Sequence, residues 1–570
     1  MSSRGPTKSD HPKVHEAFAL MKAERMDRRE FIRVAALLGT SAASAYALAG
    51  LPQPAFAATS LPFGPDDPKA KMGGTFKIAM EVQKMEDPAT YDWVPMSNQT
   101  RHTVEYLTLT DPQNITHPML AESWSASEDL KTWTFNLRQG VMWHNGDEFT
   151  ADDVAWNVKR WLDPKTASSN VGLSTFSALL EDTGEKDDKG KPVKRMAKGS
   201  IQVVDKHTIR FNLNKPVLSA PEDFYNYPTA ICHPGFKAPI STDLIGTGPY
   251  ALAELRVGDR CILKRVTKMS NGQDFHYWGG KVYLDEIAYF NFEGDNQLNA
   301  FASGDVDAVY EFTIEQMDLA KSLDGNVVTA PSAQTIACRM QVDQKPFSDK
   351  RVRQAICKSV DNGVIVKLIF PTGAYEGQNH HVAQVHPDYA PVLPPLQRDV
   401  AAAKQLLKEA GFDNGLTVTV DCGNTDGPWQ QTVAESMREQ MKEAGITLNI
   451  NIMPAAKYWE IWTKTPFGIT SWTHRPLGTM CMSLAYRTGV PWNESRYANP
   501  EFDKALDAAE AILDVNERKP KLMNAAKILQ DDCVMIMPLF RPIYTIVSKN
   551  VQNYHGHPTQ YHQFNKVWKT

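Results

Sequence analysis

A strand–helix–strand pattern in the C-terminal half of the chain constrains the fold more than any other feature. Residues 416–421 and 446–452 have the side-chain pattern of half-buried strands. Residues 429–444 between them have the apolar spacing of an amphipathic helix, which Gly445 ends. Two strands joined by a helix lie parallel in a sheet. The pattern therefore predicts an α/β fold, with residues 423–426, the loop after the first strand, at the carboxyl edge where parallel sheets bind ligands.

Strands and helices alternate elsewhere in the chain as well. Residues 132–138 have the pattern of a half-buried strand, and after them Thr150 is a helix N-cap with Asp153 at the position of a capping box. A further helix is expected between Asp399 and Gly411. Because the chain has 570 residues and its elements alternate in two regions, we expect two α/β lobes.

Two segments have less regular patterns. Residues 182–198 are charged and low in apolar residues, so we expect an exposed excursion there. Asn499 and Pro500 open a helix that we expect to run through Leu513, because asparagine is a good cap and proline fits the first helical position.

The N-terminal segment has the features of an export signal. Arg28 and Arg29 precede an uncharged, weakly apolar segment, residues 34–51, and residues 55–57 have the small-x-small pattern of a cleavage site. This resembles a twin-arginine signal peptide and predicts cleavage after Ala57, with the mature protein free in the periplasm. A membrane anchor is the alternative, but hydroxyl side chains and glycines dilute the apolar segment below what a spanning helix needs.

Charge and cysteine content argue against several classes of partner. The predicted signal peptide holds eight Lys and Arg against five Asp and Glu, so its removal lowers the formal net charge from -5 to near -8. This balance argues against nucleic acid or an anionic membrane as the main partner. The seven cysteines lack metal-binding spacing; in the periplasm they permit one or two disulfides and leave at least one thiol, with no pairing indicated. We expect His380, His381 and His386 to face solvent rather than bind a metal, and we expect no cofactor.

Several short runs, in order along the mature chain, resemble those of one family. The longest is TWTFNLRQGVMWHNGDEFTADDVAWNVKR at residues 132–160, preceded by LAESW at 120–124. The shorter runs are GTGPY at 246–250, YWGG at 277–280, ASGDVD at 302–307 and FSDKRVRQA at 347–355. Together they resemble the extracytoplasmic solute-binding proteins of peptide-, nickel- and opine-type ABC transporters, which form family 5 of the bacterial solute-binding proteins.

The resemblance implies a two-lobed periplasmic binding protein, type II-like, that closes over its ligand about a hinge and carries an extra subdomain in lobe I. The expected division is a signal peptide at 1–57, lobe I at 58–292 with an inserted subdomain at about 93–221, lobe II at 293–538 and a C-terminal return to lobe I at 539–570. Hinge strands are expected near 290–294 and 537–541. Closure of this kind needs few crossing strands between rigid lobes.

The segment from Trp459 to Trp492 concentrates aromatic and cationic side chains that suit a polar ligand. Indole rings cover aliphatic or sugar-ring surface, and a guanidinium holds a carboxylate or phosphate through two parallel hydrogen bonds. The candidate ligand-binding residues here are Trp459, Trp472, His474, Arg475, Tyr486 and Arg487. The alternative is that the tryptophans belong to the core and the arginines pair with Glu494 or Glu460 at the surface.

Two departures from the family pattern remove negative charge from the expected site. By the resemblance, peptide binders carry an aspartate for the peptide's amino group at the position of residues 472–475, where this chain has none. An ammonium beside Arg475 is disfavoured by about 1 kcal/mol or more. On the facing lobe, Met96, next to Ser97, stands where oligopeptide binders contribute a ligand-contacting acid. Asn424 and Asp426, in the loop at residues 423–426, complete the candidate set.

The expected function is that of a monomeric, periplasmic substrate-binding component of an ABC importer, which captures a peptide or other polar solute between its lobes and delivers it to the permease. It is not expected to be an enzyme. The charge pattern favours an anionic sugar, an opine or an oligosaccharide, whereas the other interpretation within the family is a peptide binder that uses Asp426 for the amine. More distant alternatives are a periplasmic hydrolase or chaperone on the same scaffold, and a binder of metal chelates or haem.

Overall fold

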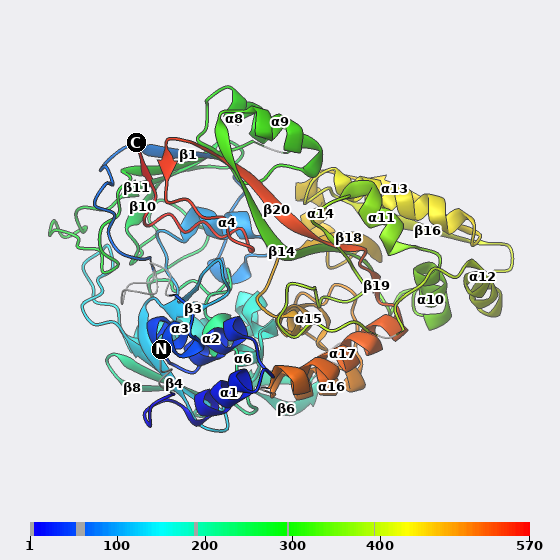
Figure 1. Ribbon diagram of the computed structural model, residues 1–570, viewed down its shortest axis with the longest axis horizontal. Coiled ribbons are helices and arrows are strands. Elements are labelled where there is room, and N and C mark those ends of the chain that lie inside the picture. Colours follow the sequence, from blue (N-terminus) through cyan, green and yellow to red (C-terminus); the bar gives the residue numbers. More distant parts are fainter. Residues whose placement is uncertain are drawn as a thin grey trace. The chain divides into compact units, whose positions relative to one another are not determined.

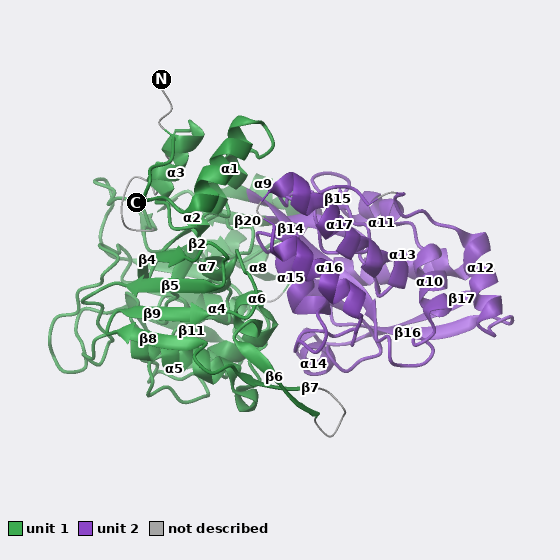
Figure 2. Cartoon of the chain, turned by 90° about the horizontal axis from the view of Figure 1, so that it is seen from below, with its two compact units in different colours: residues 1–312, 316–328, 544–570 green, residues 313–315, 329–543 purple. Residues whose placement is uncertain are grey.

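The computed structural model describes residues 5–52, 63–186, 192–292, 294, 296–392, 394–512 and 514–570 (Figure 1). The predicted cleavage position after Ala57 lies outside these residues. By its internal contacts the chain divides into unit 1, residues 1–312, 316–328 and 544–570, and unit 2, residues 313–315 and 329–543 (Figure 2). β14 (Gly325–Met340) and β20 (Leu539–Ser548) each run across a boundary. The lobes predicted from sequence are divided at residues 292 and 538, and that division stays a prediction.

Unit 1 is built on two sheets. In one, the strands follow the order β10-β11-β12-β1-β13 and then β20, with β1 parallel to β12. The other is antiparallel with the order β4-β5-β9-β8, and α5 packs against β8 and β9. The strands of these sheets are β1 (Thr75–Ala79), β4 (Ala121–Ala126), β5 (Thr132–Leu137), β8 (Ile201–Asp205), β9 (Thr208–Asn212), β10 (Tyr250–Arg256), β11 (Arg260–Arg265), β12 (Glu286–Phe290) and β13 (Ala308–Val309).

The remaining elements of unit 1 are helices and short strand pairs. Its helices are α1 (Pro12–Lys22), α2 (Arg28–Leu37), α3 (Ala42–Ala49), α4 (Val94–Thr100), α5 (Ala151–Leu162), α6 (Ser174–Ser177), α7 (Ala220–Asp223), α8 (Asn296–Ala302) and α9 (Met317–Ser322). The pairs are β2 (Thr108–Thr110) with β3 (Thr116–Pro118), β6 (Leu180–Lys186) with β7 (Pro192–Met196), and β21 (Val551–Gln552) with β22 (Trp568–Lys569).

Two predictions for unit 1 can be compared with these elements. The capping box is confirmed: Thr150 and Asp153 exchange the expected backbone hydrogen bonds at the start of α5. The described residues 182–186 and 193–198 are largely exposed, as expected, but they are more regular than predicted because β6 and β7 pair as antiparallel strands. Cross-strand ion pairs such as Arg195 with Glu181 accompany that pairing.

Unit 2 contains the predicted strand–helix–strand unit. β16 (Leu416–Cys422) and β17 (Ile446–Ile452) are parallel, with Leu416 opposite Ile446, and α13 (Trp429–Lys442) packs on both. β18 (Phe467–Trp472) lies beside β16 and is antiparallel to β14. The α/β fold class is thereby confirmed.

Two helices of unit 2 begin at the predicted caps, and α12 also ends at the predicted glycine, whereas α16 ends before the predicted residue. Asp399 accepts a hydrogen bond from the amide of Ala402 at the start of α12, and Gly411, just past its end, has a φ of 87°. Asn499 caps α16, which ends at Glu510; Leu513, where we expected the end, lies outside the described residues. The other elements are α10 (Lys350–Lys358), α11 (Asn362–Ile369), β15 (Tyr375–Glu376), α12 (Val400–Glu409), α14 (Ala455–Ile461), α15 (Gly478–Tyr486), α16 (Pro500–Glu510), α17 (Val515–Asp532) and β19 (Met535–Ile536). In the part of the chain that the structure describes, no helix is long and apolar enough to cross a membrane.

A buried ion pair joins the segments of unit 2. Arg339 of β14 donates from Nε to Glu494 Oε2 at 2.7 Å and from Nη1 to the carbonyl of Thr465 at 2.7 Å, and both charged side chains are at most 2% exposed. The same carboxylate accepts hydrogen bonds from Thr470 and from the indole of Trp472, at 2.5 and 2.9 Å. The pair therefore connects β14, β18 and the loop that carries Glu494.

Replacing Glu494 by alanine should lower the free energy of unfolding of unit 2 by about 3–5 kcal/mol, because it leaves the Arg339 guanidinium buried without its carboxylate. The matched control is Asp343→Ala, which removes the partner of exposed Arg496 and should cost about 1 kcal/mol or less. Urea unfolding followed by tryptophan fluorescence measures both. Equal effects of the two substitutions would contradict the importance of the buried pair.

Candidate functional site

Three of the predicted ligand-binding residues lie together at the end of β18. Trp472 is its last residue, and His474 and Arg475 follow, all at most 4% exposed. The amide of Ala333 donates to His474 Nδ1 at 3.0 Å, so a neutral His474 carries its proton on Nε2. Arg475 donates from Nη1 to the carbonyls of Thr473 and His474, at 3.3 and 3.1 Å. The guanidinium is thus fixed in part by neutral oxygens of its own segment.

Buried histidines surround this corner of unit 2. His386 Nε2 hydrogen-bonds the carbonyl of Arg475 at 3.1 Å, and the rings of His386 and His474 are 6.1 Å apart. His381 Nε2 hydrogen-bonds the hydroxyl of Tyr486 at 3.0 Å. The prediction that His380, His381 and His386 face solvent is therefore wrong: they are 1%, 1% and 3% exposed.

Burial also sets the charge of these histidines. It lowers the pKa of His380 and His386 to about 4 and that of His381 to about 3, so all three are neutral near pH 7. Neutral imidazoles act as hydrogen-bond donors and acceptors rather than as cations. Among the described residues, no group of three or more His, Cys, Asp or Glu side chains is arranged to hold a metal ion.

Trp459 and Trp472 of the candidate set are connected through two further tryptophans, Trp462 and Trp492. Trp472 donates to Glu494 and lies 5.9 Å from the ring of Trp492, which in turn is 6.4 Å from Trp462. Trp459, half-buried in α14, lies 5.7 Å from Trp462 in an edge-on contact. This row of indole rings supports the alternative that tryptophans contribute to the core, at least for Trp472.

Arg487 has acidic partners on another helix. It donates to Asp507 at 2.8 Å and to Glu510 at 3.0 Å, both in α16. Tyr486, the last residue of α15, donates to the sulfur of Met535 at 2.7 Å besides contacting His381. Arg487 is thus held in an ion-pair network with α16, while Tyr486 belongs to the buried histidine corner.

The loop after β16 contains an acid that already has a cationic partner. Asp426 accepts two hydrogen bonds from Arg541, one at 2.5 Å from Nη2 and one at 3.1 Å from Nε, and a third at 2.9 Å from Gln334 Nε2. Both charged side chains are at most 3% exposed, and the Arg541 guanidinium lies 5.5 Å from the ring of Trp429. Arg541 and Gln334 were not predicted from sequence, because they lie 115 and 92 residues from Asp426 and no local pattern marks them.

Asn424 shapes that loop. It has a φ of 48°, in the left-handed region that asparagine tolerates, and its side-chain oxygen accepts from the amide of Gln431 at 3.1 Å. In this conformation Asn424 fixes the turn that presents Asp426.

In unit 1, Met96 and Ser97 lie in α4. Ser97 accepts a hydrogen bond from Arg101 Nη2 at 3.0 Å and donates to the carbonyl of Val94 at 2.8 Å, and Met96 is 9% exposed. Arg101, which was not predicted, is buried. Its guanidinium lies 4.1 Å from the ring centre of Tyr561 and donates a hydrogen bond to the hydroxyl of Tyr225. Ser97, the neighbour of Met96 in the chain, thus contacts a buried cation that also contacts aromatic rings and neutral oxygens.

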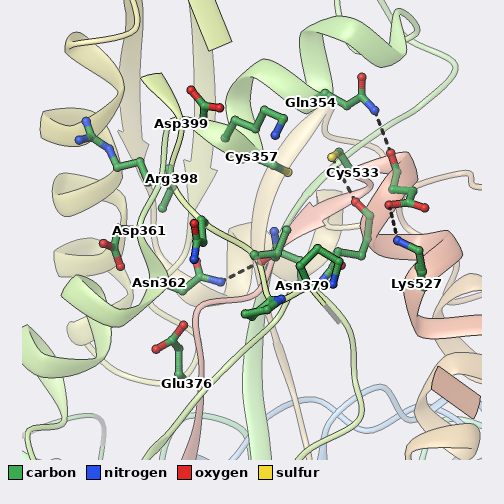
Figure 3. Close-up of a pocket in the computed structure, with 18 residues that line it drawn as sticks. Gln354, Cys357, Asp361, Asn362, Glu376, Asn379, Arg398, Asp399, Lys527 and Cys533 are labelled. Atoms are coloured by element: carbon green, nitrogen blue, oxygen red, sulfur yellow. Dashed lines mark hydrogen bonds and ion pairs between the residues drawn. The ribbon is translucent and has the colours of Figure 1, made fainter. Parts of the chain in front are cut away.

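Unit 2 also has a cavity of about 770 Å³ that none of the predicted ligand-binding residues lines (Figure 3). Its walls come from α10, α11, α17 and the segment before α12, and Asn362 donates to Asn379 across it at 3.1 Å. The lining residues are Gln354, Cys357, Lys358, Val360, Asp361, Asn362, Glu376, Asn379, Pro394, Pro395, Leu396, Gln397, Arg398, Asp399, Lys527, Gln530, Asp531 and Cys533.

Two of the seven thiols meet at this cavity. The thiol of Cys357 donates to the carbonyl of Met535 at 3.5 Å and lies against that of Cys533, and the Cys533 thiol and burial raise the pKa of Cys357 well above its ordinary value. Cys533 also donates to the carbonyl of Gln530 at 3.2 Å (Figure 3). By contrast, Cys338 and Cys422 lie opposite Ile469 on its two sides in the sheet, which separates their Cα atoms by roughly 10 Å.

Oxidised glutathione should link Cys357 to Cys533 and leave Cys338 and Cys422 as thiols. The two cysteine thiols become one disulfide while one oxidised glutathione becomes two reduced molecules, and a disulfide does not span Cα atoms more than about 7 Å apart. Because the thiolate is the reacting species, incubation at a pH of about 9 is appropriate. Alkylation and peptide mass mapping identify the linked pair. Recovery of Cys357 and Cys533 as free thiols after prolonged oxidation would contradict this expectation.

Comparisons with known proteins identify the class. A sequence model of the bacterial extracellular solute-binding proteins, family 5 Middle, matches residues 116–484. The dipeptide-binding protein DppE of Bacillus subtilis (strain 168) is 26% identical over 531 residues, which cover 86% of this chain and 92% of DppE.

Solved structures share the fold. One is the ABC transporter-associated periplasmic binding protein DppA from Helicobacter pylori in complex with the peptide STSA, with a TM-score of 0.75, 21% identity and coverage of 88% of this chain and 98% of DppA. Another is AgaA from A. tumefacien R10 in complex with agropinic acid, with a TM-score of 0.74, 20% identity and coverage of 87% and 99%. The fold is thus that of the two-lobed periplasmic binding proteins.

The chain belongs to family 5 of the bacterial extracellular solute-binding proteins, the solute-binding components of ABC transporters. This match confirms the resemblance drawn from the sequence runs. The family consists of solute-binding proteins rather than enzymes.

Proposed function

We propose that this protein works in the periplasm as the solute-capturing component of an ABC importer, and that its solute carries an anionic group. Family membership supports the binding role, and the twin-arginine-like N-terminal segment supports export. Capture between two lobes, delivery to a permease and a monomeric state follow from the family's mode of action and remain part of the proposal.

The contacts of Asp426 carry the choice of an anionic solute. Its carboxylate accepts two hydrogen bonds from Arg541 and one from Gln334 in a buried setting. A peptide amine that used Asp426 would have to compete with Arg541 and would leave that guanidinium buried without its partner, at a cost of about 3–5 kcal/mol. This cost disfavours the runner-up interpretation, in which Asp426 anchors a peptide amino terminus.

The other acid near the candidate residues is also engaged. Glu494 accepts from Arg339, Thr470 and Trp472, so its charge is balanced within unit 2. Next to Trp472 lie the imidazole of His474, whose neutral form carries its proton on Nε2, and the guanidinium of Arg475. A carboxylate or phosphate accepts from such donors, whereas an ammonium is repelled by the guanidinium. Opine-like conjugates, sugar acids and peptides bound through a carboxylate share this chemistry.

A peptide remains the second candidate, because DppE is named a dipeptide-binding protein. The two structural comparisons show the fold alone, and their ligands include both a peptide and agropinic acid. The choice between these solute classes therefore depends on the residues of this chain. A hydrolase or chaperone role has less support, since the family consists of binding proteins.

Arg475→Gln should weaken binding of an anionic solute by about 2 kcal/mol or more, close to thirtyfold, if the guanidinium pairs with it. Arg487→Gln is the matched control: it removes the same charge from a residue engaged with Asp507 and Glu510, and it should leave the affinity unchanged. Mass spectrometry of natively purified protein identifies a bound solute. Titration calorimetry then measures the affinity of both variants for this solute, and circular dichroism verifies that both are folded.

The chemistry of the solute is tested with capped analogues. For a peptide, amidation of the carboxylate should reduce the affinity and acetylation of the amine should not; for a sugar acid, the neutral parent sugar should bind more weakly. The opposite pattern, loss of binding on acetylation alone, would reject the anionic-solute proposal in favour of an amine-anchored peptide.

Arg28→Lys combined with Arg29→Lys should block export, because a twin-arginine signal depends on the arginine pair and not on its charge alone. Cell fractionation and immunoblotting of the double variant and the parent, expressed in the same host, measure this. The control is Lys8→Arg, which changes a basic residue outside the pair. Undiminished periplasmic accumulation of the double variant would exclude the twin-arginine route.

A further inference from the structure

The N-terminal segment packs into unit 1 as three helices. α2 contacts both β3 (Figure 1) and α7 (Figure 2). Every residue from Glu30 to Leu37 is buried, including apolar Phe31. The helix start is specified as well, since Asp27 accepts from the amides of Arg29 and Glu30 at 2.9 Å. α2 thus has the burial and capping of a structural element.

A buried ion pair connects α2 to the body of unit 1. Arg33 donates from Nη1 to Glu222 Oε1 at 2.8 Å, and from Nε and Nη2 to Glu30 at 2.7 and 2.9 Å. The side chains are 4% exposed for Arg33 and 0% for both acids. Glu222 lies in α7, 189 residues away in sequence. An apolar segment that only passes through a membrane has no need of a partner at that distance.

The backbone at the end of α2 fits unit 1 closely. The indole of Trp124 in β4 donates to the carbonyl of Leu37 at 2.8 Å. Gly39, with a φ of 91°, follows; a Cβ there would lie 2.4 Å from the carbonyl oxygen of Trp124, so only glycine fits. At the other end of the segment, the ring of His11 hydrogen-bonds the carbonyl of Ser127 at 3.2 Å. Polar, apolar and steric complementarity therefore all occur at the same surface.

We propose that the surface of unit 1 formed by β3, Trp124 and α7 with Glu222 is a binding site for the chain's own N-terminal segment, which it holds as helix α2 whether or not the chain is cut after Ala57. Departure of α2 would separate the Glu222 carboxylate from Arg33, and the loss of this buried ion pair opposes release. The occupant is this segment, because the charge and the close backbone fit match its own residues.

Docking of α2 leaves one part of the arginine motif exposed and buries the other part. Arg28 and Arg29 are exposed, whereas Phe31 and Arg33 of the same helix are buried. A receptor can reach the arginine pair on docked α2 but reaches Phe31 and Arg33 only after the helix leaves. This consequence rests on the proposed export role; the binding site itself does not.

The test uses the full-length chain. Hydrogen exchange of the intact protein measures the amides of residues 30–37, which we expect to be protected. Signal peptidase is then used to cut the chain, and gel filtration shows whether the N-terminal fragment co-elutes with the body. Glu222→Ala should speed the exchange of these amides by about a hundredfold or more and release the fragment. Arg28→Met, which removes the same charge as loss of Arg33 but at an exposed position, should change neither result.

A double variant separates loss of docking from misfolding. Arg33→Met with Glu222→Met replaces the pair by apolar side chains and should restore protection relative to Glu222→Ala, because buried ion pairs tolerate such replacement. Exchange of residues 30–37 in the parent at the rate of an unstructured peptide would overturn the proposal, as would a cut fragment that elutes apart from the body. Neither measurement involves export or solute, so failure of the twin-arginine route or of the anionic solute leaves this result interpretable.

Discussion

The ion pair between Arg339 and Glu494 is the constraint on which unit 2 depends. A guanidinium without solvent contact must place its N–H groups on acceptors, and here the acceptors come from the Glu494 loop and the loop before β18. The Glu494 carboxylate in turn accepts hydrogen bonds from Thr470 and Trp472 of β18. These bonds fix the position of β18 and the orientation of the Trp472 indole. His474 and Arg475 begin directly after this point. Their position therefore depends on how the buried charge of Arg339 is satisfied in β14, the strand beside β18.

The same principle bears on the proposed solute class. In unit 2 Glu494 is paired with Arg339 of β14, and Asp426 is paired with Arg541 of β20. Burial keeps His381 and His386 neutral, so they supply hydrogen bonds without charge. A binding surface with its acids neutralised and an arginine within it favours anions through electrostatics and not only through shape. In the proposed function, the solute class depends on how charged side chains pair with one another, and a shared fold does not determine this pairing.

Much of the fold follows from local sequence, and most of the site does not. The capping box at Thr150 and Asp153 and the strand–helix–strand unit at residues 416–452 are confirmed because caps and periodicity depend on neighbours a few residues away. The pairing of Asp426 with Arg541 joins residues 115 apart, for which a single sequence carries no signal. The histidines of the loop before α12 were expected at the surface for the same reason: a polar loop side chain is buried only when another segment, such as Tyr486 for His381, supplies its partner.

Composition and packing lead to opposite expectations for the N-terminal segment. Its weakly apolar, uncharged stretch is typical of a signal that leaves the protein, yet its Arg33 is satisfied by Glu222 inside unit 1. The two can be reconciled by the geometry of one helix. Arg28 and Arg29 occupy the first turn and stay in solvent, while the following turns carry the buried residues. Recognition of the arginine pair therefore does not require α2 to undock, whereas recognition of Phe31 does, and the strength of the Arg33 ion pair sets the free energy that separates the two steps.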